Sequence, residues 1–258
     1  MASAALDSVL ERGALDAVAT RALAAAATEI AAWPAGSHVW GHYAEETASG
    51  PAICRTENVS ACHPAVAALV DGPLLTIASE RLDAPAAAFK DKINYKQPGG
   101  AGFRPHQDAV AYPGVPRVVS VLVAIDECSR TSGCLWLASG VDAVLPVDER
   151  GVVRADVCDG LIWEAAELAP GDAVVLDGFA PHYSEANASA RERRVLVASY
   201  TRADAGYDRA TYYARRDEAM TASTERDGRF RISTLADFAG AEVAVSSRAV
   251  DTCTHPPA

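Results

Sequence analysis

The chain lacks the features that would place a protein in a membrane or on nucleic acid. Its 258 residues contain no run of about 20 apolar side chains, the length that a bilayer span requires. The alanine-rich start contains acidic residues and no basic leader, which argues against a secretion signal. The net charge is -11, so no broad cationic surface is expected for phosphate backbones. We therefore expect a cytoplasmic protein without membrane or nucleic-acid partners.

Cysteine pairs at metal-binding spacing are also missing. The six cysteines form no CxxC motif and no repeated finger spacing, so the sequence predicts neither a structural zinc site nor a disulfide scaffold. We expect most of the thiols to be small buried apolar groups. A catalytic thiol would need a nearby base, which the sequence does not indicate.

Half of the residues are hydrophobic, which is enough to build a large core in one domain of this length. We predict a single catalytic domain over residues 1–258, with a helical N-terminal part that reaches about residue 50. Its β core should cover about residues 85–202, and a helix and tail should follow over residues 203–258. In the first part, the alanine-rich run at residues 14–33 has high helix propensity and ends before a proline.

Short β-rich runs separated by Gly, Pro, Asp and Ser turns fill the middle of the chain. The run VVSVLVAI at residues 118–125 predicts a strand buried on both faces, and similar runs follow at residues 134–138, 173–176 and 195–200. No long helix separates consecutive strands, which favours a β-sandwich or jelly roll over a parallel α/β sheet. The predicted fold class is therefore mainly β, with helices before and after the strands.

The segment PHQDA contains a histidine and a carboxylate two residues apart, His106 and Asp108. On a strand, residues i and i+2 point to the same face, so both side chains would reach one metal ion. His182 follows another predicted strand and is the best third ligand. This set leaves positions on the metal open, as in non-haem iron(II) oxygenases, whereas the same atoms would also suit a hydrolytic zinc site. An isolated HxD pair is more often structural, so the prediction depends on further residues.

Arg193 lies eleven positions beyond His182, after the polar, turn-rich segment YSEANASARE. A hairpin there would bring Arg193 beside the metal ligands, where its guanidinium suits a bidentate grip on the distal carboxylate of 2-oxoglutarate. Ser184 would share the face of His182 and donate a second hydrogen bond. The alternative is that the run RERR is a solvated charge cluster, but the apolar strand after it favours an interior position for Arg193.

The segment FKDKINYK alternates so that Lys90, Lys92 and Asn94 share one face if it forms a strand. In a barrel interior, these side chains would contact the co-substrate or an anionic substrate. On an edge strand they would instead face solvent, where lysines discourage aggregation. The sequence leaves both interpretations open. Together with Arg55, the lysines suit an anionic or zwitterionic substrate.

These segments together resemble the phytanoyl-CoA dioxygenase-like family of iron(II)- and 2-oxoglutarate-dependent oxygenases. The matching segments are KDKINYKQPGGAGFRPHQD, SGCLWLASG, ELAPGDAVVLDGFAPHYSEANASARERRVLV and YYARRDE, which occur in family order. The resemblance implies a double-stranded β-helix in which His106, Asp108 and His182 bind iron(II). It further implies that 2-oxoglutarate is the co-substrate of O2 and is anchored by Arg193 and Ser184.

Within this family, the sequence is most similar to bacterial enzymes that act on small polar compounds, including the 2-aminoethylphosphonate dioxygenases. Natural-product hydroxylases have similar sequence patterns. One departure lies at residues 139–142, where many members have proline, glycine, serine and histidine, so a known substrate specificity does not carry over. Asp108 argues against the halogenase branch, which has a small residue in place of the carboxylate.

The expected reaction is hydroxylation of a C–H bond in a small metabolite, with release of succinate and CO2. Desaturation, ring closure or oxidative cleavage are alternative outcomes, and a metabolite-binding barrel is the non-enzyme alternative. Substrate contacts are assigned to Tyr112, Lys90, Gln107 and Trp136. Gln107 points away from the metal on an ideal strand, and core packing is the alternative role for Trp136. The sequence predicts neither the substrate's identity nor the oligomeric state.

Overall fold

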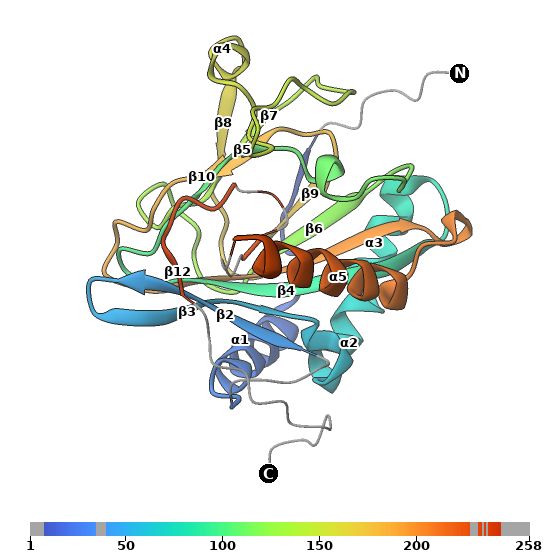
Figure 1. Cartoon of the computed structure of the whole chain (residues 1–258). Helices are drawn as coiled ribbons and strands as arrows, with labels where there is room; N and C mark the ends of the chain where they lie inside the picture. The colour runs from blue at the N-terminus through green and yellow to red at the C-terminus, as the bar shows by residue number, and fades with distance from the viewer. Residues whose placement is uncertain (1–7, 35–39, 228–231, 234, 236, 244–258) are drawn as a thin grey trace.

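Two antiparallel β-sheets form the centre of the molecule, with helices packed outside them (Figure 1). The computed structural model describes residues 8–34, 40–227, 232–233, 235 and 237–243. The larger sheet has eight strands in the order β1-β9-β6-β11-β4-β3-β2-β12, and the smaller sheet has four in the order β5-β10-β7-β8. This architecture confirms the predicted mainly β jelly roll with flanking helices.

The strands of the larger sheet are β1 (Val9–Glu11), β2 (Gly41–Thr47), β3 (Gly50–Glu57), β4 (Ala86–Lys96), β6 (Val119–Ala124), β9 (Ala173–Asp177), β11 (Arg193–Arg202) and β12 (Glu242–Val243). The smaller sheet contains β5 (Phe103–His106), β7 (Leu135–Ala138), β8 (Trp163–Ala166) and β10 (His182–Ser184). The α-helices are α1 (Ala17–Ala31), α2 (Pro64–Val70), α3 (Pro73–Leu82), α4 (Ala155–Cys158) and α5 (Arg209–Asp227). Short 3-10 helices lie at Val59–Ala61, Asp108–Ala111 and Ala203–Ala205.

Strand β4 separates the helical layer from the interior, because its side chains alternate between the two faces of the sheet. Ile93 and Tyr95 are buried in an apolar cluster with the helices. Lys90, Lys92 and Asn94 point to the opposite face and line an interior pocket. The structure therefore decides between the two positions that the sequence left open for FKDKINYK, in favour of the barrel interior.

Helices α1, α2 and α3 cover the outer face of the larger sheet (Figure 1). Helix α1 confirms the helix predicted in the alanine-rich run, and Asp16 caps it by accepting hydrogen bonds from the backbone N–H groups of Val18 and Ala19. Helix α5 confirms the predicted helix after the last long strand and packs against β4. No helix in the described part of the chain is long and apolar enough to cross a membrane.

The N-terminal part differs from the helical segment predicted to about residue 50. Strands β2 and β3 form a hairpin that pairs with β4, while β12 pairs with β2 and β1 pairs with β9. Polar residues in β2 interrupt the apolar alternation that predicts a strand. They are buried because they form hydrogen bonds with residues far away in the sequence. His42 Nδ1 lies 2.8 Å from the Thr56 hydroxyl, and Glu45 accepts a 2.9 Å hydrogen bond from Ala101 N–H. The larger sheet therefore extends beyond the predicted β core of residues 85–202.

Four cysteines are free thiols, and three of these, Cys54, Cys128 and Cys134, are buried, in agreement with their predicted role as small apolar groups. Burial raises the pKa of Cys54 to about 12, so this thiol stays protonated at neutral pH. Cys62 is disulfide-bonded, a pairing that the cysteine spacing did not predict.

The substitution Leu23→Ala should lower the free energy of unfolding by about 2–5 kcal/mol, because Leu23 is fully buried in the helical layer and its loss leaves a cavity. Val18→Ala on the same helix is the matched control. Val18 is 67% exposed, so its substitution should change the stability by less than about 0.5 kcal/mol. Urea unfolding measures both values, and equal losses would contradict the described packing of α1.

Candidate active site

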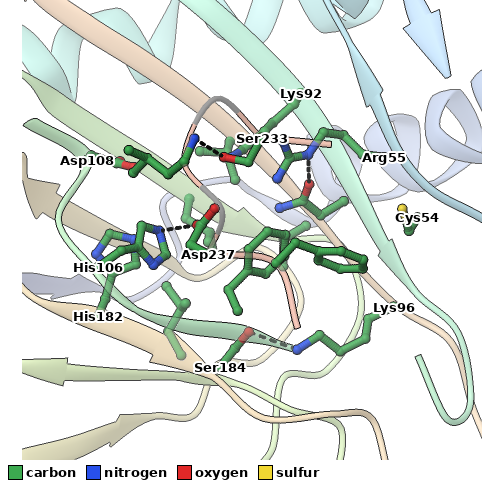
Figure 2. Close-up of a pocket in the computed structure, with 18 of the residues that line it drawn as sticks. Cys54, Arg55, Lys92, Lys96, His106, Asp108, His182, Ser184, Ser233 and Asp237 are labelled. Carbon is green, nitrogen blue, oxygen red and sulfur yellow. Dashed lines mark hydrogen bonds and ion pairs between the residues drawn. The ribbon is translucent and has the colours of Figure 1, made fainter. Parts of the chain in front are cut away.

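Three potential metal ligands, His106, Asp108 and His182, converge in a pocket lined by both sheets (Figure 2). One ligand atom from each residue lies within 4.8 Å of those from the other two. His106 in β5 and His182 in β10 are direct cross-strand partners, and their ring centroids are 4.2 Å apart. Antiparallel strand pairing thus brings together the two histidines that sequence reasoning combined.

Asp108 reaches this cluster by a different route from the one predicted. The sequence placed His106 and Asp108 on one strand, but β5 ends at His106 and Asp108 begins the 3-10 helix Asp108–Ala111. The turn still directs the carboxylate toward the histidines. Ser120 on β6 fixes it by donating a 2.8 Å hydrogen bond to Oδ2 of Asp108.

Backbone carbonyls orient both imidazole rings. His106 Nδ1 lies 2.7 Å from the carbonyl oxygen of Arg104, and His182 Nδ1 lies 3.0 Å from that of Ala180. A carbonyl oxygen only accepts, so each Nδ1 carries a hydrogen, which leaves each Nε2 as the nitrogen that would bind a metal. Burial and the neighbouring His106 lower the pKa of His182 to about 4, which keeps this ring neutral.

Asp108 is held in its anionic form. Burial opposes ionisation of the carboxyl, but its electrostatic interactions with His182 and then Lys92 outweigh burial and lower the pKa of Asp108 below its usual range. Two neutral imidazoles and one carboxylate are the protonation states that a divalent cation requires. The donor set therefore fits iron(II), with no disagreement between the residues and the metal that the sequence implied.

Arg193 is buried in the same pocket without a carboxylate partner among the described residues. One of its terminal nitrogens donates to the carbonyl oxygen of Gly133, but its Nε has no hydrogen-bond partner there. Burial lowers the pKa of this guanidinium, yet Arg stays charged at neutral pH. A buried, incompletely satisfied guanidinium in a pocket is suited to an incoming carboxylate.

Lys96 lies beside Arg193 and was not singled out by sequence reasoning, although it continues the alternation of Lys90, Lys92 and Asn94. Its Nζ donates a 2.9 Å hydrogen bond to the hydroxyl of Ser184, which lines the pocket as predicted. Burial, and then the nearby charge of Arg193, lower the pKa of Lys96 to about 6. Lys96 therefore adds a basic side chain beside Arg193 whose protonated form an entering carboxylate would favour.

The predicted hairpin before Arg193 is wrong. Strand β10 belongs to the smaller sheet and β11 to the larger one, so the intervening chain crosses from one sheet to the other. Asn187 holds this crossing in place through hydrogen bonds from its side-chain amide to the carbonyl oxygens of Lys96 and Arg191. Arg193 then pairs with Lys96 at the start of β11 and points into the pocket.

A second group of cationic side chains lies near Asp108. Lys90 donates a 3.1 Å hydrogen bond to the hydroxyl of Tyr112, which also lines the pocket. Burial and the charge of Arg55 lower the pKa of Lys92 well below its ordinary value. Arg55 donates a 3.1 Å hydrogen bond to the side-chain oxygen of Asn94. A second set of basic side chains, apart from Arg193 and Lys96, therefore lines the pocket.

This chain is similar to known proteins in sequence and in fold. The family model described as phytanoyl-CoA dioxygenase matches residues 8–195. The chain belongs to the phytanoyl-CoA dioxygenase family. Like the family, it is an oxidoreductase of the dioxygenase class that uses iron(II), 2-oxoglutarate and O2.

Two curated relatives of this family member are named for phosphonate chemistry. The methylphosphonate hydroxylase of Gimesia maris is 35% identical over 82% of this chain and 83% of that protein. The 2-aminoethylphosphonate dioxygenase of an uncultured bacterium is 33% identical over 77% of this chain and 78% of that protein.

Among solved structures, EctD from S. alaskensis is similar with a TM-score of 0.67 and 20% identity, over 80% of this chain and 76% of that one. The epimerase SnoN from nogalamycin biosynthesis is similar with a TM-score of 0.64 and 20% identity, over 77% of both chains. At this identity, the two structures support the fold of this phytanoyl-CoA dioxygenase family member.

Two residues assigned to the substrate lie outside the pocket of this phytanoyl-CoA dioxygenase family member. Gln107 is fully buried and fastens two loops, donating to the carbonyl oxygens of Ala143 and Phe179 and accepting from Leu145 N–H. Trp136 stacks on Tyr183, with their ring centroids 5.9 Å apart. Both side chains therefore have packing roles, which corrects their assignment as substrate contacts.

Sequence reasoning also missed the contribution of the C-terminal part. Ser233, Asp237 and Phe238 line the pocket, although the sequence after α5 is polar and weakly periodic. Figure 2 shows Asp237 pointing toward His106, and its Oδ2 lies 3.2 Å from His106 Nε2. The sequence around Asp237 has no motif that would identify it, because Asp237 reaches the pocket only through the tertiary fold.

Asp108→Ala and His182→Ala should each weaken iron(II) binding by more than about tenfold, because each removes one of three proposed ligands. His63→Gln changes a histidine outside the pocket and should leave iron binding unchanged. Anaerobic titration with iron(II), followed by metal analysis of the desalted protein, measures all three. Stoichiometric, tight iron binding by Asp108→Ala would contradict the assigned ligand set.

Proposed function

We propose that this dioxygenase hydroxylates a C–H bond of a small phosphonate. Iron(II) would be bound by His106, Asp108 and His182, and 2-oxoglutarate would be anchored by Arg193. The observation that supports the substrate class is the second cationic group near Asp108. We further propose that the chain acts as one catalytic domain in the cytoplasm.

The cationic end at Arg193 supports the placement of 2-oxoglutarate. The free Nε of Arg193 and the hydroxyl of Ser184 supply donors for a carboxylate, while Lys96 adds a third. His182 and Ser184 are two residues apart on β10, so a ligand that chelates the metal can extend along this strand toward Arg193. The distal carboxylate would thus be gripped while the 2-oxo acid end reaches the iron.

The balance of charge in the pocket supports an anionic substrate. The chain as a whole carries a net charge of -11, yet cationic side chains outnumber acidic ones in the pocket lining. The cationic residues are Arg55, Lys90, Lys92, Lys96 and Arg193, and the acidic residues are Glu45, Asp108 and Asp237. An anion that enters raises the pKa of the buried lysines, so this excess of basic side chains favours a dianionic ligand in addition to 2-oxoglutarate.

The length of β4 allows both ligands to bind at once. Lys90 and Lys96 are six residues apart on this strand, which corresponds to roughly 20 Å. Lys96 accompanies Arg193 at one end, and Lys90 accompanies Asp108 at the other. A phosphonate at Lys90 and Lys92 would therefore hold its carbon chain beside the metal ligands. The names of the two curated relatives support this substrate class.

When bound, iron and 2-oxoglutarate supply an oxidant that breaks a C–H bond, while the co-substrate leaves as succinate and CO2. The residues of the chain provide orientation for this reaction. Ser120 and the carbonyl oxygens of Arg104 and Ala180 fix the three ligands. The cationic ends hold the two anions in place, so the reacting carbon is positioned before oxygen arrives.

Succinate formation tests the proposed function directly. The anaerobically purified, iron-loaded enzyme should form succinate in the presence of 2-oxoglutarate and O2 when a small alkyl or aminoalkyl phosphonate is added, and mass spectrometry should find a product heavier by one oxygen. Matched carboxylates of equal chain length are the controls. Stimulation by the carboxylates but by none of the phosphonates would contradict the proposed substrate class.

Arg193→Ala should raise the dissociation constant of 2-oxoglutarate by about 10-fold to 150-fold, since it removes a charge-assisted hydrogen-bond donor. Calorimetric titration of the iron-loaded protein under anaerobic conditions measures this change. Arg191→Ala removes an exposed arginine outside the pocket lining and should have no such effect. Equal 2-oxoglutarate affinities for Arg193→Ala and the parent enzyme would contradict the assigned anchor.

Binding of 2-oxoglutarate should also take up a proton at Lys96. The pKa of Lys96 is about 6 in the free pocket, and a carboxylate beside it would raise this pKa. The complex then binds more protons than the free enzyme above pH 6, so the affinity should fall as the pH rises. Calorimetry in buffers of different ionisation enthalpy measures the uptake, which should vanish in Lys96→Met. Pure pH independence in the parent enzyme would refute this assignment.

A further inference from the structure

Asp237 brings an acidic side chain to a pocket in which basic side chains outnumber acidic ones. It is 3% exposed, and its Oδ2 lies 3.2 Å from Nε2 of His106 (Figure 2). Its Oδ1 is buried and has no hydrogen-bond partner among the described residues. Neither the metal set nor the 2-oxoglutarate anchor uses this carboxylate, so its place in the pocket needs another explanation.

Two backbone hydrogen bonds hold Asp237 and Ala239 against β5 and the residue before it, Gly102. Arg104 N–H donates a 2.7 Å hydrogen bond to the carbonyl oxygen of Asp237, and Ala239 N–H donates a 3.0 Å bond to that of Gly102. The side chain of Phe238 packs into an apolar cluster with Tyr43 and Cys54. These contacts aim the carboxylate into the pocket and leave it little freedom to turn away.

Iron would remove the partner that Asp237 has in the metal-free pocket. A metal bound at Nε2 of His106 would take this nitrogen away from its 3.2 Å contact with Oδ2 of Asp237. Both carboxylate oxygens would then lack a partner in a buried site, which costs free energy unless another cation approaches. Asp237 therefore needs a positively charged group close to the metal.

Permanent ligation of iron by Asp237 does not satisfy this need. An octahedral metal offers six positions, of which three are assigned to protein ligands and two to the 2-oxo acid end of 2-oxoglutarate. A fourth protein ligand would occupy the last position and exclude O2. Lys90 bonds to Tyr112 and Arg55 to Asn94, while the proposed function assigns Lys92, together with Lys90, to the phosphonate group. The substrate is the remaining source of a cation.

We propose that Asp237 binds the ammonium group of an aminoalkyl phosphonate and selects this zwitterion over alkyl phosphonates. The inference rests on the proposed function, which places the phosphonate group at Lys90 and Lys92. The substrate then lies between charges of opposite sign, with its carbon chain beside the metal ligands. A charge-assisted hydrogen bond to a buried carboxylate contributes enough affinity to discriminate against a methyl group in the same position.

Binding of two isosteric ligands tests this inference. The anaerobic complex of the enzyme with iron(II) and 2-oxoglutarate is titrated calorimetrically with 2-aminoethylphosphonate and with propylphosphonate, in which a methyl group replaces the ammonium. The parent enzyme should bind the aminophosphonate at least about tenfold more tightly. Asp237→Asn should weaken aminophosphonate binding by at least about tenfold and change propylphosphonate binding by less than about threefold, with iron content unchanged.

Asp142→Asn makes the same charge change on an exposed loop outside the pocket lining and should change neither affinity. Asp237→Glu keeps the charge and should retain part of the preference for the ammonium group. Equal binding of the two phosphonates by the parent enzyme, equal weakening of both in Asp237→Asn, or loss of iron in that variant would each overturn the role of Asp237 while leaving phosphonate hydroxylation intact. Failure of the parent enzyme to bind either phosphonate would overturn the proposed function and this inference with it.

Discussion

The alternation of side chains along β4 is the constraint on which the rest of the structure depends. Ile93 and Tyr95 are buried among the helices, so the residues between and beyond them must face the interior. Those residues are lysines and an asparagine, which apolar packing alone would exclude from a core. A shift of one residue in the register of β4 would turn Ile93 and Tyr95 away from the helices and toward the pocket. The helical layer therefore determines which polar groups enter the pocket.

Because basic side chains are buried in the pocket, bound anions should stabilise the folded protein. Burial lowers the pKa of Lys92, Lys96 and Arg193, which means that the protein disfavours their charged forms in the empty pocket. An anion that enters restores favourable electrostatics and uses donors such as Nε of Arg193 that lack partners. Ligand binding and folding are thus linked, because anions that bind only the folded state stabilise it.

The sequence predicts those helices and strands that form because of their own periodicity and residue propensities. The apolar run of β6, the alanine-rich helix α1 and the helix α5 follow directly from periodicity and propensity. Sequence reasoning also combined His106 with His182, which follows a predicted strand, and the structure makes the two residues cross-strand partners. The predictions of β6, α1 and α5 required only the pattern of residues within each segment.

The wrong predictions concern segments whose structure depends on contacts with residues far away in the sequence. Strand β2 carries buried polar residues that find their partners on other strands and loops, so its own sequence gives no clear period. The crossing before Arg193 and the hairpin predicted in its place have the same turn-rich composition, and only the division into two sheets separates them. Gln107 looked available for substrate, but loops far along the chain take up its donors and acceptor.

The pocket divides its tasks among parts of the chain that can change independently. The proposed metal ligands come from β5, the following turn and β10, and the proposed anchor for 2-oxoglutarate comes from β4 and β11. The acidic group of Asp237 comes instead from the C-terminal part, which is joined to β5 and the preceding Gly102 by two backbone hydrogen bonds. Backbone bonds hold this segment whatever side chain stands at position 237. A different residue there would alter the charge next to the metal while the ligand geometry stays the same, so substrate choice can vary without loss of the oxidation chemistry.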